Sequence, residues 1–175
     1  ALLLQSQLRP FSLWEFTTVL FLDVSMMNQI KRSALVGYSP EHMFDLVNDI
    51  QSYPEFLDGC VATELLEQTE NYVVAKMHLK KAGIEISLST KNILTRPSKI
   101  VITLVEGPFT SFSGEWAFKG IGNEACKLSL DLNFQLNNSI ARFAVSKLMA
   151  EVANDLVKLI CNRAEKLYGC ADSVI

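Results

Sequence analysis

Histidine is scarce in this chain of 175 residues, and its two copies are poorly placed for acid–base chemistry. His42 falls in the first turn of an expected helix and His78 on the polar face of an expected strand, so we expect both to be solvated. No Ser, His and Asp stand in a recognisable catalytic order, and there is no glycine-rich phosphate loop. These absences disfavour enzymes that depend on a histidine base, a nucleophile triad or a bound nucleotide phosphate.

Closely spaced cysteines are missing as well. The four cysteines lie at positions 60, 126, 161 and 170, with no Cys-x-x-Cys pair among them. Zinc sites and thioredoxin-like motifs need such pairs, so no metal site is expected. Cys126 begins an expected strand and Cys161 lies in a helical pattern, which predicts small buried apolar side chains that stay reduced in a cytoplasm.

An excess of positive charge is also absent, since 16 Lys and Arg stand against 19 Asp and Glu and give a net charge of −3. General nucleic-acid binders usually carry a basic excess, so DNA is not an expected partner. Hydrophobic residues make up 49% of the chain, which is an ordinary share for a globular protein. At this length we expect one domain with a core of its own.

The first 25 residues differ from the rest, because they hold an apolar stretch without the features of a membrane helix. Residues 11–24 are interrupted by Glu15 and Asp23 and are too few to span a bilayer, which takes about 20 nearly uncharged residues. The stretch also lacks the basic start and cleavage site of a secretory signal. We interpret it as an upstream extension, with a surface-lying anchor as the alternative. The expected organisation is an extension over residues 1–25, a domain over 26–170 and a tail over 171–175.

Alternation of apolar and polar residues dominates the middle of the chain. A period of two predicts an antiparallel sheet with one dry face and one wet face. Short connections such as Lys80-Lys81-Ala82-Gly83 predict hairpins between sequential neighbours, and therefore a meander. The expected strands cover residues 30–36, 64–67, 73–79, 84–88, 100–104, 112–118 and 128–136.

Helical patterns flank these strands. Ser39-Pro40-Glu41 predicts a helix start, with a capping hydroxyl, proline at the first position and an acid at the positive end of the dipole. Tyr53-Pro54 predicts the end of that helix, followed by a short turn over residues 55–57. From Asn138 or Ser139 to Gly169 the helical period persists, and about 30 residues span roughly 45 Å. The fold class is therefore α+β with a helix-grip architecture: a curved antiparallel sheet of about seven strands surrounds a long C-terminal helix, with short helices after the first strand.

Three motifs carry a resemblance to a known family. The run from Val47 to Leu57 (VNDIQSYPEFL) is similar to the signature of the coenzyme-Q-binding START-domain family, which is also described as polyketide cyclase/dehydrase-like. Lys81-Ala82-Gly83-Ile84, and Gly107-Pro108-Phe109 followed by Gly114-Glu115-Trp116-Ala117-Phe118, resemble that family too. The resemblance extends over residues 28–169. It implies a START or Bet v 1-like fold.

The resemblance also implies a function. It indicates a non-enzymatic protein that binds ubiquinone or a similar isoprenoid lipid, requires no cofactor and supports respiration. The bacterial branch is linked instead to ribosome-association toxins, which bind the large ribosomal subunit and block its joining to the small one. A polyketide cyclase or dehydrase is a third hypothesis that rests on fold similarity. One departure is Asp58, where the family pattern has proline, and it concerns the loop at the expected pocket mouth.

The dry face carries many long or aromatic side chains, which either fill the core or line an apolar pocket. We predict a pocket for a polyprenyl quinone. The sheet residues expected to line it are Met77, Leu79, Ile86, Leu88, Ile102, Leu104, Trp116, Phe118, Leu130 and Leu132. The helix residues expected to close it are Val145, Met149, Val152 and Leu156. The turn with Tyr53, Pro54 and Phe56 is the expected lid, because proline stiffens it and its aromatic rings can cover an apolar ligand.

Polar groups that a cyclase would need are few. Thr90 and Asn92 are the best candidates, and we expect them at the end of the sheet rather than in the pocket. Asp49, Glu55 and Asp58 are expected to be solvated acids at helix ends and loops.

One segment is locally basic. Between residues 76 and 99 the single acid Glu85 stands among six cations, namely Lys76, Lys80, Lys81, Lys91, Arg96 and Lys99. Such a basic hairpin could contact phospholipid head groups or ribosomal RNA, although charge runs are usually solvated faces. The expected location is the cytoplasm, with transient contact with the inner membrane as an alternative.

Overall fold

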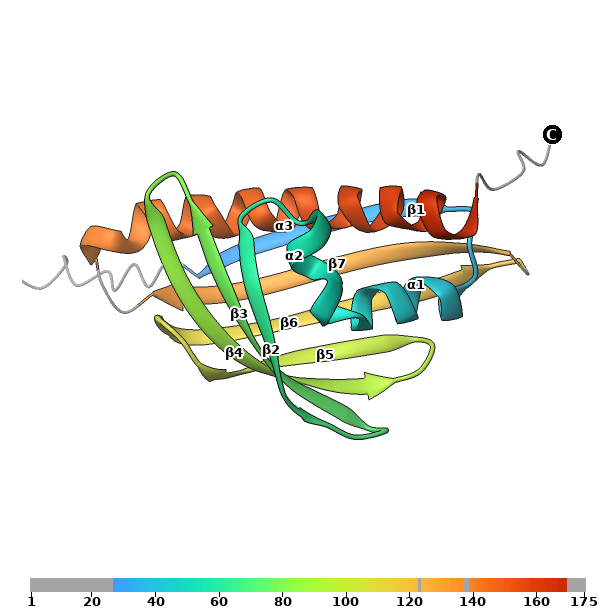
Figure 1. The fold of residues 1–175 in the computed structure, drawn as a ribbon, viewed down its shortest axis with the longest axis horizontal. Coiled ribbons are helices and arrows are strands. Elements are labelled where there is room, and N and C mark those ends of the chain that lie inside the picture. The colour runs from blue at the N-terminus through green and yellow to red at the C-terminus, as the bar shows by residue number, and fades with distance from the viewer. Residues whose placement is uncertain (1–26, 123, 137–138, 170–175) are drawn as a thin grey trace, which may run out of the picture.

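Seven strands form one antiparallel sheet that curves around a long helix, in a computed structural model that describes residues 27–122, 124–136 and 139–169 (Figure 1). The strands lie in the spatial order β1-β7-β6-β5-β4-β3-β2, so all but β1 follow one another as a meander. Their bounds are β1 Asn28–Val36, β2 Cys60–Gln68, β3 Tyr72–Lys81, β4 Ile84–Thr95, β5 Lys99–Glu106, β6 Phe109–Ile121 and β7 Ala125–Leu136. The expected extension over residues 1–25 and the expected tail over residues 171–175 lie outside the described residues.

The alternation seen in the sequence sets the two faces of the sheet. In β7 the even-numbered residues are buried and the odd-numbered ones are more exposed along the strand. Gly114 in β6 lies opposite Leu132, and a Cβ atom at Gly114 would come within 2.6 Å of Leu132 Cδ2. The absence of that Cβ lets Leu132 lie flat against the sheet.

The connection from β1 to β2 carries the short helices α1 (Pro40–Asn48) and α2 (Tyr53–Phe56), joined by the 3-10 turn η2 (Ile50–Ser52). Ser39 caps α1, and its Oγ accepts a hydrogen bond from the His42 N–H at 3.3 Å. The predicted end of this helix at Tyr53-Pro54 is wrong, because α1 already ends at Asn48 and Asp49 leaves helical geometry with a ψ of 63°. Pro54 instead lies in the first turn of α2, where its missing N–H costs nothing.

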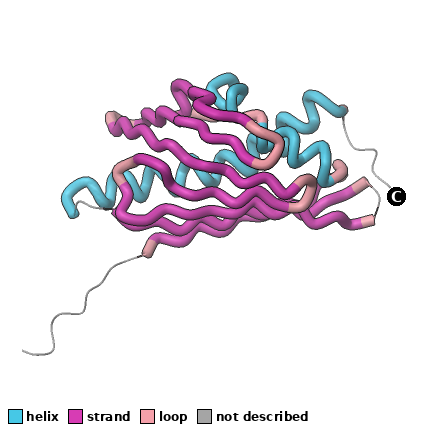
Figure 2. Tube along the Cα trace, turned by 90° about the horizontal axis from the view of Figure 1, so that it is seen from below, coloured by secondary structure: helices cyan, strands magenta, loops and turns pink. Residues whose placement is uncertain are grey.

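Helix α3 (Ser139–Tyr168) runs along the concave side of the sheet. Figure 2 shows the strands as one curved layer, with the helices on its concave side. It ends as predicted at Gly169, whose φ of +82° suits glycine and whose N–H donates to the Glu165 carbonyl at 3.0 Å. The Tyr38 hydroxyl donates to the Gly169 carbonyl at 2.7 Å and ties this end to the loop after β1. Within the described ranges, no helix is both long and apolar enough to cross a membrane.

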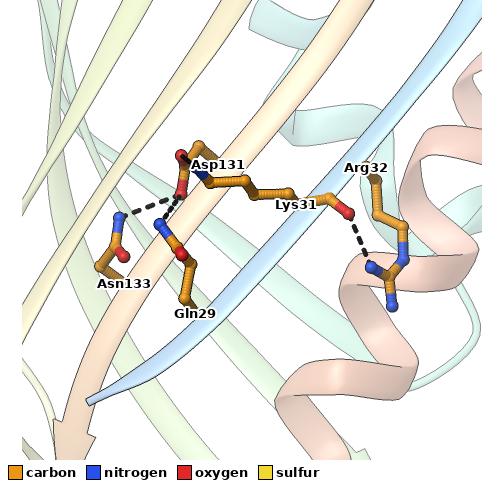
Figure 3. Close-up of polar contacts among 5 residues, drawn as sticks. All are labelled: Gln29, Lys31, Arg32, Asp131 and Asn133. Carbon is orange, nitrogen blue, oxygen red and sulfur yellow. Dashed lines mark hydrogen bonds and ion pairs between the residues drawn. The ribbon is translucent and has the colours of Figure 1, made fainter.

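The convex face of the sheet is polar, as Figure 3 shows for β1 and β7. Asp131 accepts hydrogen bonds from Gln29 at 3.4 Å and from Asn133 at 3.0 Å, and it pairs with Lys31 Nζ at 3.3 Å. Arg32 points the other way, toward α3, where it donates to Asn154. The apolar face of the sheet is therefore the concave one, which faces α3.

Candidate functional site: an apolar cavity under the long helix

A cavity of about 100 Å³ lies between the concave face of the sheet and α3. Strands β3 to β7 form its floor, α3 its roof, and α1, η2 and α2 border one side. Its lining residues are Val47, Ile50, Tyr53, Ala75, Met77, Leu79, Leu88, Thr90, Asn92, Ile100, Ile102, Phe112, Trp116, Leu130, Leu132, Met149, Val152, Ala153 and Leu156. Period two along the strands and the helical period along α3 bring these distant residues to one apolar surface.

Most of the residues predicted to line a pocket do border this cavity. They are Met77, Leu79, Leu88, Ile102, Trp116, Leu130 and Leu132 from the sheet, and Met149, Val152 and Leu156 from α3. Whether they bind a ligand remains a prediction. The three expected lid residues differ in location: Tyr53 lines the cavity, Phe56 is half-buried and Pro54 is exposed.

The remaining predicted residues, Ile86, Leu104, Phe118 and Val145, do not border the cavity. Phe118 packs against the Phe44 ring of α1 at 5.4 Å between centroids, so it fills the core beside the cavity. Leu104 lies near the end of β5, and its Cδ1 atom is 3.3 Å from where Gly107 would carry a Cβ. Ile86 and Val145 are buried in the core but outside the cavity. The strand and helix periods predicted that these residues face the interior. They could not predict which interior residues border the cavity and which pack in the core beside it.

Several lining residues were missed. They are Val47, Ile50, Ala75, Ile100, Phe112 and Ala153. Ala75, Ile100 and Phe112 stand in the same period-two pattern as their predicted neighbours, so that signal was present in the sequence. Val47 and Ile50 come from the short helices, and only the three-dimensional path of that connection brings them under α3.

Thr90 and Asn92 are polar residues within the cavity wall, so the expectation that they lie at the end of the sheet is wrong. Asn92 is only 7% exposed, and its Oδ1 atom is enclosed with no hydrogen-bond partner. A register shift between Ser89 and Thr90 in the pairing of β4 with β5 interrupts the ladder just before these residues. The extra residue at this shift is Val105 of β5, so β4 keeps its alternation and Leu88, Thr90 and Asn92 share its concave face.

Tyr53 is the only ionisable side chain among the residues that line the cavity. Its hydroxyl is buried and donates to the Val47 carbonyl at 2.6 Å. Burial, with a contribution from Asp49, raises the pKa of Tyr53 well above its ordinary value of 10.0. The phenol therefore stays protonated at neutral pH and is unsuited to act as a base.

A clasp of charged groups lies where the β3–β4 hairpin meets α3. Lys81 Nζ lies 2.9 Å from Asp58, 3.5 Å from Asp155 and 3.9 Å from Glu151. We call these four residues the Lys81 clasp. Its hydrogen bond to Lys81 lowers the pKa of Asp58, and the same bond raises the pKa of Lys81. The clasp joins the loop before β2, the end of β3 and the helix, and so holds the edge of the sheet against α3.

The other acids and the histidines also find partners. Glu55 pairs with Arg163 of α3 at 3.1 Å and thereby fixes α2 to the helix. His78 is only partly exposed, since its ring bonds to Ser87 and to Glu64, each at 2.7 Å. Burial raises the pKa values of Cys60 and Cys126 to about 11, so these thiols stay protonated. In the described part of the chain, no cluster of His, Cys, Asp and Glu could hold a metal ion.

The predicted basic segment does not form one basic hairpin. Lys80 and Lys81 lie at one end of β4, whereas Arg96 and Lys99 lie at its other end, and Lys76 and Lys91 stand between. Carboxylates neutralise many of these cations: Lys80 pairs with Glu85 at 3.2 Å, Lys99 with Glu115 at 3.8 Å, Arg96 with Asp45, and Lys81 with its clasp. Lys91 lies over the Tyr72 ring at 3.9 Å. Strand pairing and the packing of α1 and α3 against the sheet, which a count along the sequence ignores, bring the acids to these positions.

The model of a family described as polyketide cyclase / dehydrase and lipid transport matches residues 36–159. The chain belongs to this family. Relatives at about 40% identity cover most of the chain. The ribosome association toxin RatA of Escherichia coli K12 is 39% identical over 154 residues, covering 88% of this chain and 97% of that protein. The RatA of Vibrio cholerae serotype O1 is 41% identical over 143 residues, covering 82% of this chain and 99% of that protein.

Solved structures with a similar fold confirm the helix-grip prediction. The Zhui aromatase/cyclase from a Streptomyces species has a TM-score of 0.74 at 19% identity, covering 85% of this chain and 99% of that one. The Ara h 8.0201 structure has a TM-score of 0.62 at 12% identity, covering 80% of this chain and 99% of that one. At these identities the likeness shows the fold alone, and the function has to be argued from the relatives and the site.

Proposed function

We propose that this protein acts on the ribosome without catalysing a reaction, by binding the large subunit and hindering its joining to the small one. The observation that carries the proposal is the similarity to proteins named ribosome association toxin, at 39% and 41% identity over nearly their whole length. Family membership alone would equally allow a cyclase. The cavity argues against that alternative, because its lining offers no carboxylate, imidazole or amine to move a proton.

Binding to ribosomal RNA calls for cations that are free to meet phosphates. Lys119 in β6 and Lys127 in β7 are cross-strand partners on the convex face, and both are exposed. Residues opposite each other in an antiparallel pair lie only about 5 Å apart, so two like charges destabilise one another unless an anion lies between them. In the described structure neither lysine pairs with a carboxylate. We therefore assign this lysine pair, rather than the predicted basic hairpin, as the contact for RNA phosphate.

The test is a sedimentation assay with purified large subunits. We expect the double variant Lys119→Glu, Lys127→Glu to bind more weakly and to lose roughly two units of the slope of log affinity against log salt, one for each phosphate contact. In cells the variant should relieve the growth inhibition and the loss of joined ribosomes that the wild type causes on overexpression.

The matched control reverses two cations that are already neutralised. Lys80→Glu, Lys99→Glu makes the same change in net charge but removes side chains paired with Glu85 and Glu115. We expect this control to keep most of the binding. Equal losses in the two double variants would contradict a specific contact at Lys119 and Lys127, and no sedimentation of the wild type would contradict action on the ribosome.

A second candidate function, binding of an apolar ligand, is supported by the cavity itself. A mostly apolar lining with few polar groups is typical of small-molecule sites. The volume of about 100 Å³ is smaller than the roughly 300–1,000 Å³ of most ligand pockets. We propose that it receives the ring-sized head of a polyprenyl quinone or similar lipid, and that the tail leaves between α3 and the sheet edge.

Filling the cavity tests this second candidate. Ala75 is 4% exposed and lines the cavity, so Ala75→Leu places three further carbon atoms inside it. We expect mass spectrometry of the organic extract to find a stoichiometric lipid with the wild type from its native host, and little with the variant. Ala62→Leu adds the same atoms at an exposed position of β2 and should retain the lipid. An empty extract from folded wild-type protein would contradict lipid binding.

A further inference from the structure

One polar atom in the cavity wall has no partner. Asn92 Oδ1 is enclosed by the protein, and no donor of the described residues reaches it. Buried polar groups are nearly always hydrogen-bonded, so an orphaned acceptor in a cavity wall needs an explanation. The position is fixed, because the Asn92 backbone pairs with Val73 of β3 on one side and with Ile102 of β5 on the other.

Among the described residues, no neighbouring group donates a hydrogen bond to Asn92 Oδ1. Its cross-strand neighbours Val73 and Ile102 are apolar, and the α3 residues that close the cavity are apolar as well. Thr90 is the nearest polar residue on the same face of β4. It lies two residues earlier and adds one hydroxyl to the cavity wall. The hydroxyl of Tyr53 already donates its proton to the Val47 carbonyl.

We propose that the cavity selects a neutral amphiphile whose buried end carries an alcoholic or phenolic hydroxyl, and that this hydroxyl donates its proton to Asn92 Oδ1. The inference rests on the second candidate function, since it names the chemical class of ligand for that cavity. It sets Asn92 as the residue that discriminates between ligands, with Thr90 beside it.

Other ligand classes fit the wall less well. A hydrocarbon leaves the Asn92 oxygen orphaned, at the cost of an unmade hydrogen bond in an apolar medium. A carboxylate meets no cation, because the cavity lining contains no Lys, Arg or His, and a buried unpaired charge is strongly disfavoured. A head group with carbonyl oxygens alone can accept from the Asn92 Nδ2 amide but leaves Oδ1 without a donor. A quinone would accordingly be held in its reduced, hydroxyl-bearing form more tightly than in its oxidised form.

The experiment compares 4-ethylphenol, ethylbenzene and 4-ethylbenzoate, which differ only in the polar substituent, by calorimetric titration of wild type and Asn92→Leu. The quantity of interest is the affinity for ethylphenol divided by that for ethylbenzene, because differences in hydration of the probes cancel when this ratio is compared between proteins. We expect the ratio to fall by about fivefold or more in the variant, since the buried hydroxyl then lacks its acceptor. Ethylbenzoate should bind neither protein.

Asn48→Leu is the matched control, because Asn48 Oδ1 is also buried without a partner but does not line the cavity. It should leave the ratio unchanged. Should leucine at position 92 prevent folding, as thermal unfolding would show, Asn92→Val gives the same comparison with a smaller side chain. A ratio that stays within twofold in Asn92→Leu, or falls equally in Asn48→Leu, overturns the assignment of Asn92. Failure of both ethylphenol and ethylbenzene to bind the wild type overturns the cavity function itself.

Discussion

The space between the sheet and α3 is packed solid beside α1 and hollow in its middle. At the solid end Met43 and Phe44 of α1 reach between α3 and β6, and Phe44 meets Phe118 with 5.4 Å between ring centroids. Cys126 and Ile160 are fully buried there. In the middle, strands β3 to β7 face α3 across the cavity, which α1, η2 and α2 border on one side only.

The difference shows what leaves a cavity in a helix-grip fold. A curved sheet and a straight helix diverge between their contacts, and side chains from one layer on each side fill the gap only in part. Where α1 inserts another layer, large side chains close the gap and packing reaches the density of an ordinary core. Substitutions at the solid end should therefore act on stability, whereas those in the middle should act first on the ligand.

The largest expected effect comes from emptying the solid end. Phe44 is 2% exposed and lies in a closely packed region, so its removal leaves a cavity that the neighbouring side chains cannot fill. We expect Phe44→Ala to lower the free energy of unfolding by about 3–5 kcal/mol. Urea unfolding followed by tryptophan fluorescence measures this change. The counterpart in the hollow middle is Met149→Ala, for which we expect a loss near the lower end of the range for such truncations, about 2 kcal/mol.

A smaller effect is expected from adding a Cβ atom at Gly114, in the strand that forms part of the cavity floor. In Gly114→Ala the new Cβ would meet Leu132 Cδ2 at 2.6 Å and Ile102 Cδ1 at 3.3 Å, and both of these side chains line the cavity. We expect them to be pushed inward, at a cost of about 1–3 kcal/mol in unfolding free energy, with loss of any bound lipid. Denaturant unfolding and mass spectrometry of the extract measure the two effects.

Gly120→Ala provides the contrast, because a Cβ atom there would meet one atom, Pro40 Cγ at 3.4 Å, and neither Gly120 nor Pro40 lines the cavity. This variant should change the unfolding free energy little and retain the lipid. If lipid retention fell to the same extent in both variants, the hollow middle would not be the place where ligands are selected.

Much of the fold could be predicted because its signals are local. Alternation gave the faces of strands β3 to β7, and the period that ends at Gly169 gave the long helix. The lining of the cavity was predicted in part for the same reason, as Leu130 and Leu132 show. Phe118 has the same alternation as Trp116, yet only Trp116 reaches the cavity, because α1 covers Phe118. That contact joins segments more than seventy residues apart in the sequence, which no local pattern records.

The charged and polar features were harder to predict. The six cations of the basic segment were counted along the chain, whereas their neutralising acids come from other strands and helices, as with Lys99 and Glu115. Asn92 follows the inward alternation of β4, so its burial was available in principle. Its position inside the cavity depends on where the curved sheet and α3 lie apart, and that is a property of the whole fold rather than of a local pattern.

The smallest expected effect comes from opening the Lys81 clasp at the edge of the hollow region. Lys81→Met keeps the apolar stem but removes the charge, and leaves Asp58, Glu151 and Asp155 without their shared cation. We expect a lower unfolding midpoint near neutral pH. The Asp58 pKa is lowered below 3.8 in the folded protein, so its contribution is present above that pH and is lost as the pH falls through the lowered pKa.

The difference between wild type and Lys81→Met should therefore shrink in acid. The Lys81 pKa is raised above 10.5, so the same contribution is also lost as the pH rises through that raised value. Thermal unfolding of both proteins across the pH range measures this window. Lys80→Met removes a cation that pairs only with Glu85 across the same hairpin, and should show no comparable window. Identical pH profiles for the two variants would mean that the grip on α3 depends on apolar contacts alone, and the edge of the cavity would then be sealed by Val152 and Leu156 rather than by charge.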